Sequence, residues 1–229
     1  MSLTLYALCG ADPARPFSPH VWKVAMALAH KGLSAQTVAV GFTDIPGIEA
    51  GATKTVPLLK DGETLVSDSF AIARYLEETY PDRPSLFGGP GGLATARLVE
   101  GWSQTQIHPL LTPILILDIH AMLAPIDQAY FRESREKRLG RTLEEAAAGA
   151  PAAIADLRTR LEPLRHTLRH QPFIGGETPL FADYIVFGAL QWARTTSKTE
   201  ILGADDPVAL WFDRCLDLHG ALGRSVTAA

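Results

Sequence analysis

Three pairs of residues in the first third of the chain place polar groups where chemistry could occur: Ser18-Pro19, Val56-Pro57 and Asp68-Ser69. Serine before proline is typical of a helix start, because the hydroxyl caps a free N–H and proline suits the first helical position. Such a hydroxyl, with the free N–H groups beside it, attracts an anion and lowers the pKa of a thiol held there. Considered alone, Ser18 is more simply a helix cap.

The other two pairs could hold the backbone and the charged end of a peptide. If the Val56–Pro57 bond is cis, the N–H and C=O of Val56 face the helix start and can pair with an extended peptide. Asp68 and Ser69 open a second helix, where they could hold the ammonium and carboxylate of an amino acid end group. A trans proline and a plain cap are the simpler alternatives.

The elements that must position these pairs follow the order β-α-β, then a β-hairpin and a helix. Strands are predicted at 3–8, 36–40, 56–59 and 64–66, with helices at 18–31 and 68–80. Asp61-Gly62 is a hairpin signal between the last two strands. The segment between the second and third strands, 41–54, is predicted to be a long loop. This order is typical of an α/β thioredoxin-like domain, which we expect over residues 1–81.

The rest of the chain is predicted to be helical. Residues 81–92 hold three prolines and four glycines, as an interdomain linker would. An all-α domain is expected over 93–229, starting with a long helix at 93–123 that Pro109 and Pro113 bend. Further helices are expected at 128–149, 152–169, 182–194 and 208–218.

The composition argues against several classes of partner. The net charge is −4 and neither domain is basic, so we expect no nucleic acid or anionic membrane partner. Two distant cysteines, Cys9 and Cys215, fit neither a disulfide framework nor a metal site. We therefore expect no metal, and the lack of a signal-like start favours a cytoplasmic location.

The order and spacing of the three pairs resemble the glutathione site of the glutathione transferase family. The resemblance covers nearly the whole chain. It implies that Ser18 activates the glutathione thiol, that Val56, held by Pro57, pairs with the cysteinyl backbone, and that Asp68 and Ser69 hold the γ-glutamyl group. It also implies a homodimer.

A narrower resemblance is to the bacterial β-aryl etherases, which cleave β-O-4 ethers with glutathione, and to the related fungal etherase-like transferases. The similar segments are 17–23, 41–43, 80–84, 181–184, 205–207, 211–214 and 220–224. One position departs from the family. Members usually carry Ser, Thr or Asn three residues before Asp183, whereas this chain has Leu180. The missing cap predicts a helix start weaker by about 1 kcal/mol.

Further residues are weaker candidates for the site. Lys54 could pair with the glycine carboxylate of glutathione, and His20 could touch the thiolate, although both could be solvated surface residues. A stripe on the long helix is a candidate wall of the substrate pocket or, more simply, core: Trp102, Gln106 and Leu110. The charges from 132 to 141 indicate a solvated face, with Arg135 or Arg138 a weaker candidate for contact with an acidic substrate group.

The sequence therefore predicts a glutathione transferase whose serine-stabilised thiolate attacks a small apolar or aromatic electrophile, with β-aryl ether cleavage as one form of the reaction. Two alternatives stay open. The chain could bind glutathione or an apolar ligand without catalysis, or it could be a glutathione-dependent thiol oxidoreductase or lyase. The last would need a cysteine in place of Ser18, because serine cannot form a mixed disulfide. The identity of the electrophile does not follow from the sequence.

Overall fold

The first domain is built on a four-stranded mixed sheet in the order β2-β1-β3-β4. The computed structural model describes residues 3–229. The strands are β1 (Leu3–Leu8), β2 (Ala35–Val40), β3 (Leu58–Asp61) and β4 (Thr64–Ser67). β1 runs parallel to β2 and antiparallel to β3, and β3 pairs antiparallel with β4. The predicted thioredoxin-like layout is confirmed.

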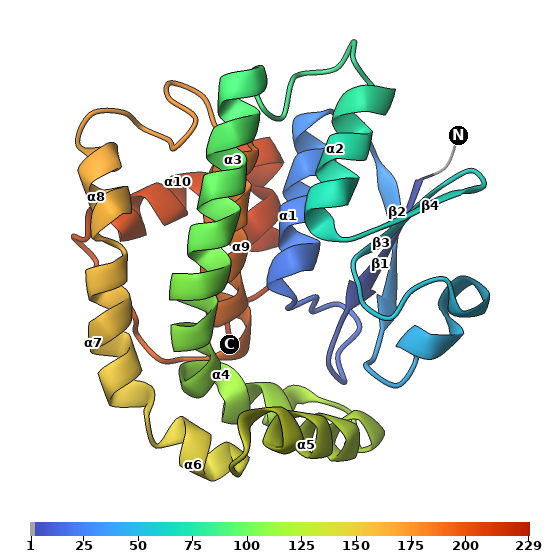
Figure 1. Ribbon diagram of the computed structural model, residues 1–229, viewed down its shortest axis with the longest axis vertical. Coiled ribbons are helices and arrows are strands. Elements are labelled where there is room, and N and C mark those ends of the chain that lie inside the picture. Colours follow the sequence, from blue (N-terminus) through green and yellow to red (C-terminus); the bar gives the residue numbers. More distant parts are fainter. Residues whose placement is uncertain (1–2) are drawn as a thin grey trace.

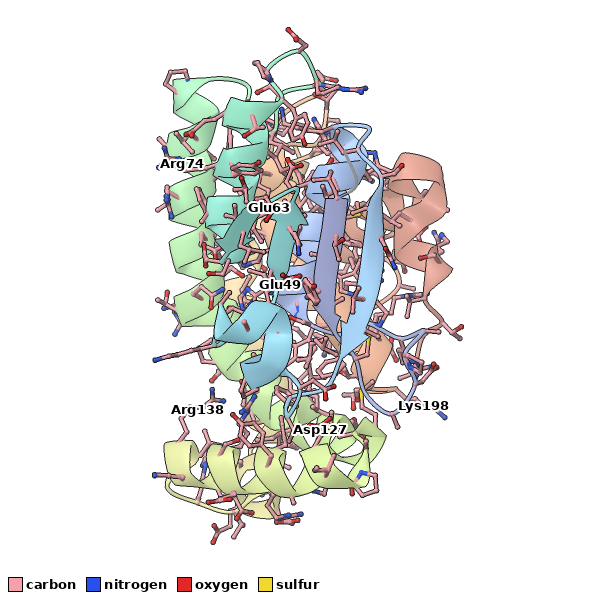
Figure 2. All side chains as sticks on the ribbon, turned by 90° about the vertical axis from the view of Figure 1, so that its right-hand side faces the viewer. Glu49, Glu63, Arg74, Asp127, Arg138 and Lys198 are labelled. Carbon is pink, nitrogen blue, oxygen red and sulfur yellow. The ribbon has the colours of Figure 1, made fainter. Side chains whose placement is uncertain are left out.

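Two helices and one short segment flank this sheet. α1 (Pro19–His30) and α2 (Ser69–Thr79) lie between the sheet and the helical domain, and their apolar faces are buried. The predicted loop at 41–54 contains a short 3₁₀ segment, η1 (Ile45–Gly51), which lies over the opposite face of the sheet (Figure 2). Glu49 of this segment pairs with Lys60 of β3 at 2.8 Å and accepts a hydrogen bond from Tyr6. These bonds tie the segment to the sheet.

The second domain is all helical, as predicted (Figure 1). Its helices are α3 (Pro90–Trp102), α4 (His108–Met122), α5 (Pro125–Leu139), α6 (Leu143–Ala147), α7 (Ala150–Arg160), α8 (Glu162–Leu168), α9 (Phe181–Thr196) and α10 (Pro207–Ala221). A π-helical segment, η2 (Ser103–Ile107), joins α3 to α4, and the 3₁₀ segment η3 (Leu222–Ser225) follows α10. Within residues 3–229, no helix is long and apolar enough to cross a membrane.

The structure corrects several predicted helix boundaries. The linker is shorter than 81–92, because Pro90 fits the first turn of α3 and Gly89 caps it with a φ of 105°. The helix predicted at 93–123 is interrupted by η2, where the backbone is wider than an α-helix. The helix predicted at 128–149 ends at Gly140, whose left-handed φ of 66° reverses the chain.

The two domains are joined by close packing and by polar contacts. α1 lies against α9, where a β-carbon on Gly188 would meet the Pro19 carbonyl oxygen at 2.4 Å, so only glycine fits. Lys23 of α1 is fully buried and pairs with Glu100 of α3 at 2.9 Å. The Thr43 N–H, after β2, donates to Asp127 of α5 at 2.8 Å. These contacts fix the walls of the space between the domains.

Candidate functional site

A cavity of about 740 Å³ lies between the two domains. Its first wall comes from the start of α1 and from the approach to β3. Its second wall comes from α4, α5 and the turn after α5. The lining residues include Ser18, His20, Phe42, Lys54, Val56, Gln104, His108, Tyr130, Phe131, Arg135, Arg138, Arg141 and Trp192. A space of this size can hold a small peptide or a drug-sized ligand.

Ser18 is the N-cap of α1 and lines the cavity, as the sequence led us to expect. Its Oγ accepts a long hydrogen bond from the Val21 N–H at 3.5 Å, which leaves the hydroxyl proton free to donate. Pro19 has no N–H, so the His20 N–H is the remaining free donor of the first turn. The serine side chain is only 4 % exposed. An anion here would meet a hydroxyl, an N–H and the positive end of the helix dipole.

The segment before β3 brings a second predicted pair to the same wall. The Val56–Pro57 bond is cis, and both Val56 and Lys54 line the cavity. In the part of the chain that the structure describes, the backbone of Val56 pairs with no other strand. Its N–H and C=O therefore remain available to an extended ligand. Pro57 itself does not line the cavity.

Asp68 and Ser69 lie at the start of α2, next to this segment. Leu58 pairs with Ser67 in the sheet, so Val56 and Asp68 flank the same end of the β3–β4 hairpin. Asp68 has a left-handed φ of 76°, and its Oδ1 accepts both the Phe70 N–H (3.0 Å) and the Ala71 N–H (2.9 Å). Its second oxygen is left without a bond to the helix. Neither Asp68 nor Ser69 lines the cavity itself.

Two histidines and a tryptophan form a half-buried corner of the cavity. The rings of His20 and His108 lie 5.3 Å apart, and His108 lies 5.8 Å from Trp192. Burial lowers the pKa of His108 to about 3, with a smaller contribution from Lys23. Burial also lowers the pKa of His20 well below its usual range, and Lys23 and His108 add to this effect. Both imidazoles are therefore neutral at pH 7, so His20 cannot act there as a cation that attracts a thiolate.

The structure does not place the predicted pocket wall of Trp102, Gln106 and Leu110 on this cavity. The lining residues in this part of the chain are Gln104, His108, Pro109, Thr112 and Pro113. Trp102 and Leu110 pack against the core cluster instead. The stripe was drawn with α-helical spacing, whereas the π-helical segment 103–107 has more residues per turn and rotates the following residues.

The missing cap at Leu180 has a compensation that the sequence analysis did not identify. Asp183 is fully buried and accepts the N–H groups of Ile174 (2.7 Å), Gly175 (2.9 Å) and Leu180 (3.0 Å), as well as the Trp211 indole N–H (3.1 Å). Burial raises the pKa of Asp183, while these four donors oppose that change. The start of α9 is thus stabilised by Asp183, and also by the Leu86 carbonyl oxygen, which accepts the Phe181 N–H at 2.7 Å.

The sequence analysis also missed the aromatic wall. Phe42 lies 6.1 Å from Tyr130 and 5.6 Å from Phe131, ring centre to ring centre, across the domain boundary. The Arg135 guanidinium lies 4.9 Å from the centre of the Phe42 ring and 4.6 Å from that of Phe131. The i, i+4 spacing of Phe131 and Arg135 was the available signal. That spacing could not predict that Phe131 and Arg135 contact Phe42, which lies some 90 residues earlier in the chain.

Comparisons with known proteins agree with this arrangement. The chain matches the glutathione S-transferase N-terminal domain over residues 13–84 and the C-terminal domain over 94–217, which is more than half of the chain. A glutathione S-transferase-like protein of Aspergillus flavus is 27 % identical over 210 residues, covering 79 % of this chain and 75 % of its own. A solved glutathione transferase of Phanerochaete chrysosporium superposes with a TM-score of 0.78 at 26 % identity, covering 98 % of this chain and 94 % of its own.

A second solved structure is a glutathione S-transferase of Ceriporiopsis subvermispora in complex with glutathione. It is 26 % identical, with a TM-score of 0.77, and the match covers 98 % of this chain and 95 % of that one. Both domains, in their order and over nearly their full length, therefore have counterparts in one group of proteins. This chain belongs to the glutathione S-transferase family.

Proposed function

We propose that the protein is a glutathione transferase in which Ser18 stabilises the glutathione thiolate for attack on an aromatic electrophile. The observation that carries this proposal is the position of the Ser18 hydroxyl. It stands at the start of α1, with its proton free, in a cavity that both domains line. Val56 would pair with the cysteinyl backbone, Lys54 with the glycine carboxylate, and Asp68 with Ser69 would hold the γ-glutamyl end.

The chemical step needs little from the protein beyond an ionised thiol and a placed electrophile. The thiol proton leaves to solvent, and the Ser18 hydroxyl and the His20 N–H donate to the sulfur that remains. The thiolate electron pair then forms a C–S bond while the leaving group departs with the electrons of the broken bond. The aromatic wall of Phe42, Tyr130 and Phe131 would hold the electrophile against this sulfur.

The leaving group defines the finer function. Cleavage of a β-aryl ether would release a phenolate by the same displacement, and the resemblance of segments such as 17–23 to the etherases favours testing it. The cavity is large enough for glutathione together with a one-ring or two-ring substrate. A homodimer and a cytoplasmic location remain predictions.

The test is a comparison of wild type with Ser18→Ala and Ser18→Thr. We expect Ser18→Ala to lower kcat/KM for a benzylic halide by about a hundredfold, with only a small change in the KM for glutathione. The pKa of bound glutathione, followed by thiolate absorbance, should rise by about one unit or more. Ser18→Thr keeps a hydroxyl and a helix cap, and should retain most of the rate.

Two results would contradict the proposal. Equal rates for wild type and Ser18→Ala would mean that the serine only caps α1. If millimolar glutathione did not raise the thermal midpoint of wild type, the proposed glutathione site would be wrong, because a ligand that binds only the folded state must stabilise it. Glutathione binding without turnover of any electrophile would favour the non-catalytic alternative.

A further inference from the structure

The charges that line the cavity are all positive. Four cationic side chains contribute to its walls: Lys54, Arg135, Arg138 and Arg141. Among the residues that the structure describes, no aspartate or glutamate lines it, although the chain as a whole carries a net charge of −4. Three of the four cations come from one short stretch of the helical domain, α5 and the turn that follows it. These three are called the arginine cluster below.

The arginine cluster has no acidic partner in residues 3–229. The side-chain hydrogen bond of Arg135 goes to the neighbouring Ser134 hydroxyl at 3.0 Å, and no carboxylate forms an ion pair with any of the three. Arg132, one turn earlier on α5, differs in this respect, because Glu136 and Glu144 both pair with it at 2.9 Å. Glu136 of α5 and Glu144 of α6 therefore pair with an arginine that does not line the cavity.

The nearby carboxylates on the facing elements are also occupied. Figure 2 shows Arg138 directed from α5 toward the side of the molecule where η1 and Glu49 lie. Glu49 is bound by Lys60 and Tyr6, and Asp127, near the other end of α5, accepts the Thr43 N–H. Burial lowers the pKa of Arg135, and the like charge of Arg138 adds to this effect. A negative charge placed between them would relieve this repulsion.

Glutathione does not account for these three charges in the proposed site. Its glycine carboxylate faces Lys54, and its γ-glutamyl end lies toward Asp68 and Ser69, all on the first domain. The arginine cluster stands on the second domain, beside the aromatic wall of Phe42, Tyr130 and Phe131. A ligand that matches this part of the cavity has an aromatic body and an oxyanion, which guanidinium groups bind with two parallel hydrogen bonds.

We propose that the second substrate is an anionic aromatic electrophile whose carboxylate is bound by Arg135, Arg138 and Arg141. This inference rests on the proposed function and narrows its substrate class. Arg135 stacks on the aromatic wall and would position the ring, while the more exposed Arg138 and Arg141 would attract the carboxylate from solution.

The experiment compares 4-(chloromethyl)benzoate with its uncharged methyl ester. In both, the glutathione sulfur forms a bond to the benzylic carbon, chloride leaves with the electron pair, and the thiol proton passes to solvent. Each kcat/KM is divided by the uncatalysed rate with glutathione. We expect wild type to favour the carboxylate by about tenfold or more, and added salt to reduce this preference.

The variants are Arg135→Gln and Arg138→Gln, with Lys137→Gln as the matched control. Lys137 lies on the same helix, carries the same charge, is exposed and does not line the cavity. We expect each arginine variant to lower the rate for the carboxylate by about five- to tenfold and to leave the ester within about twofold. Arg138 is exposed, so its variant should fold even if Arg135→Gln does not. The control should change neither substrate.

Three results would overturn the proposal. Wild type could turn over the acid and the ester at equal corrected rates, the arginine variants could slow both equally, or the variants could raise the KM for glutathione instead of the electrophile. If neither electrophile reacts, the proposed function fails separately. Binding of unreactive 4-methylbenzoate then decides this inference, because it should still be weakened in Arg138→Gln and not in Lys137→Gln.

Discussion

Aspartates at two helix starts serve opposite purposes in this molecule. Asp183, at the start of α9, is fully buried and both of its oxygens accept hydrogen bonds, from four donors in all. Asp68, at the start of α2, is exposed, and only its Oδ1 is used to cap the helix. Both oxygens of Asp183 are therefore used within the fold, whereas one oxygen of Asp68 is not used to cap its helix.

The same contrast extends to the regions around the two residues. The segment before α9 is held by the bonds to Asp183. The cavity wall instead contains a free hydroxyl proton on Ser18, a buried His108 Nε2 without a partner, and three arginines without acidic partners. Polar groups that the fold leaves unpaired on a cavity wall are candidates for ligand contacts. Substitutions around Asp183 should therefore lower the stability of the protein, whereas substitutions on the cavity wall should change ligand binding or turnover.

The largest expected effect is on the first region. Asp183→Ala removes the acceptor from four donors at once, and the burial of those donors without partners should lower the free energy of unfolding by about 3–5 kcal/mol. Denaturant unfolding followed by circular dichroism measures this loss. Asp156→Ala, at an exposed position on α7, is the control and should change stability by less than about 0.5 kcal/mol. If Asp183→Ala lowered the free energy of unfolding by less than about 1 kcal/mol, Asp183 would not have the structural role that distinguishes it from Asp68.

The sequence predicted the elements that carry Asp68 and Asp183, but not the hydrogen bonds that Asp183 accepts. Local patterns were sufficient for the sheet and for the start of α1, because alternation and caps act over a few residues. The order of elements also placed Ser18 and Val56 on one cavity wall, with Asp68 at the neighbouring end of the β3–β4 hairpin. The bonds from Asp183 to Ile174 and Trp211 were not predictable, since they depend on how a loop and α10 pack around α9.

The substrate side of the cavity was less predictable for a physical reason. A single π-helical segment after Trp102 changes which side of the helix faces the cavity, so α-helical spacing selected residues that do not line it. Arg135 was identified only as a weak candidate, because a charged helix face usually points to solvent. Its contact with Phe42 exists only after the two domains have docked.

A smaller effect, which depends on pH, should appear at the cavity wall. Because the pKa of His108 is lowered to about 3, the unfolded chain binds a proton there below about pH 6.5 and the folded chain does not. The contribution of neutral His108 to the free energy of unfolding is therefore fully present above pH 6.5. It is lost as the pH falls, by about 2 kcal/mol at pH 5. His20 and Lys23, which face His108, are unchanged in a His108→Phe variant.

His108→Phe removes this titration while it keeps a ring in the corner. The difference in unfolding free energy between pH 7 and pH 5 should be smaller in the variant by about 2 kcal/mol. At pH 7 the substitution should cost less than about 1 kcal/mol, because the Nε2 atom that it removes has no partner. Parallel pH profiles for the two proteins would show that His108 is protonated equally in the folded and unfolded chains.

The smallest effect is the most specific, because one oxygen of Asp68 caps α2 and the other is free. Asp68→Asn keeps the capping oxygen, and asparagine tolerates the left-handed backbone at φ 76°. It removes the negative charge and replaces the free oxygen with an NH₂ group. Stability without ligand should therefore change by only a few tenths of a kcal/mol, while glutathione affinity falls about tenfold, or about 1.4 kcal/mol.

Asp68→Ala separates the two roles of this residue. It removes both oxygens and puts a β-carbon with no compensating hydrogen bond at a positive φ, so stability should fall by about 1 kcal/mol or more in addition to the loss of affinity. Calorimetric titration with glutathione and thermal unfolding without it give the two quantities independently. If Asp68→Asn bound glutathione as wild type does, the free oxygen would have no ligand role, and Asp68 would cap its helix just as Asp183 stabilises the start of α9.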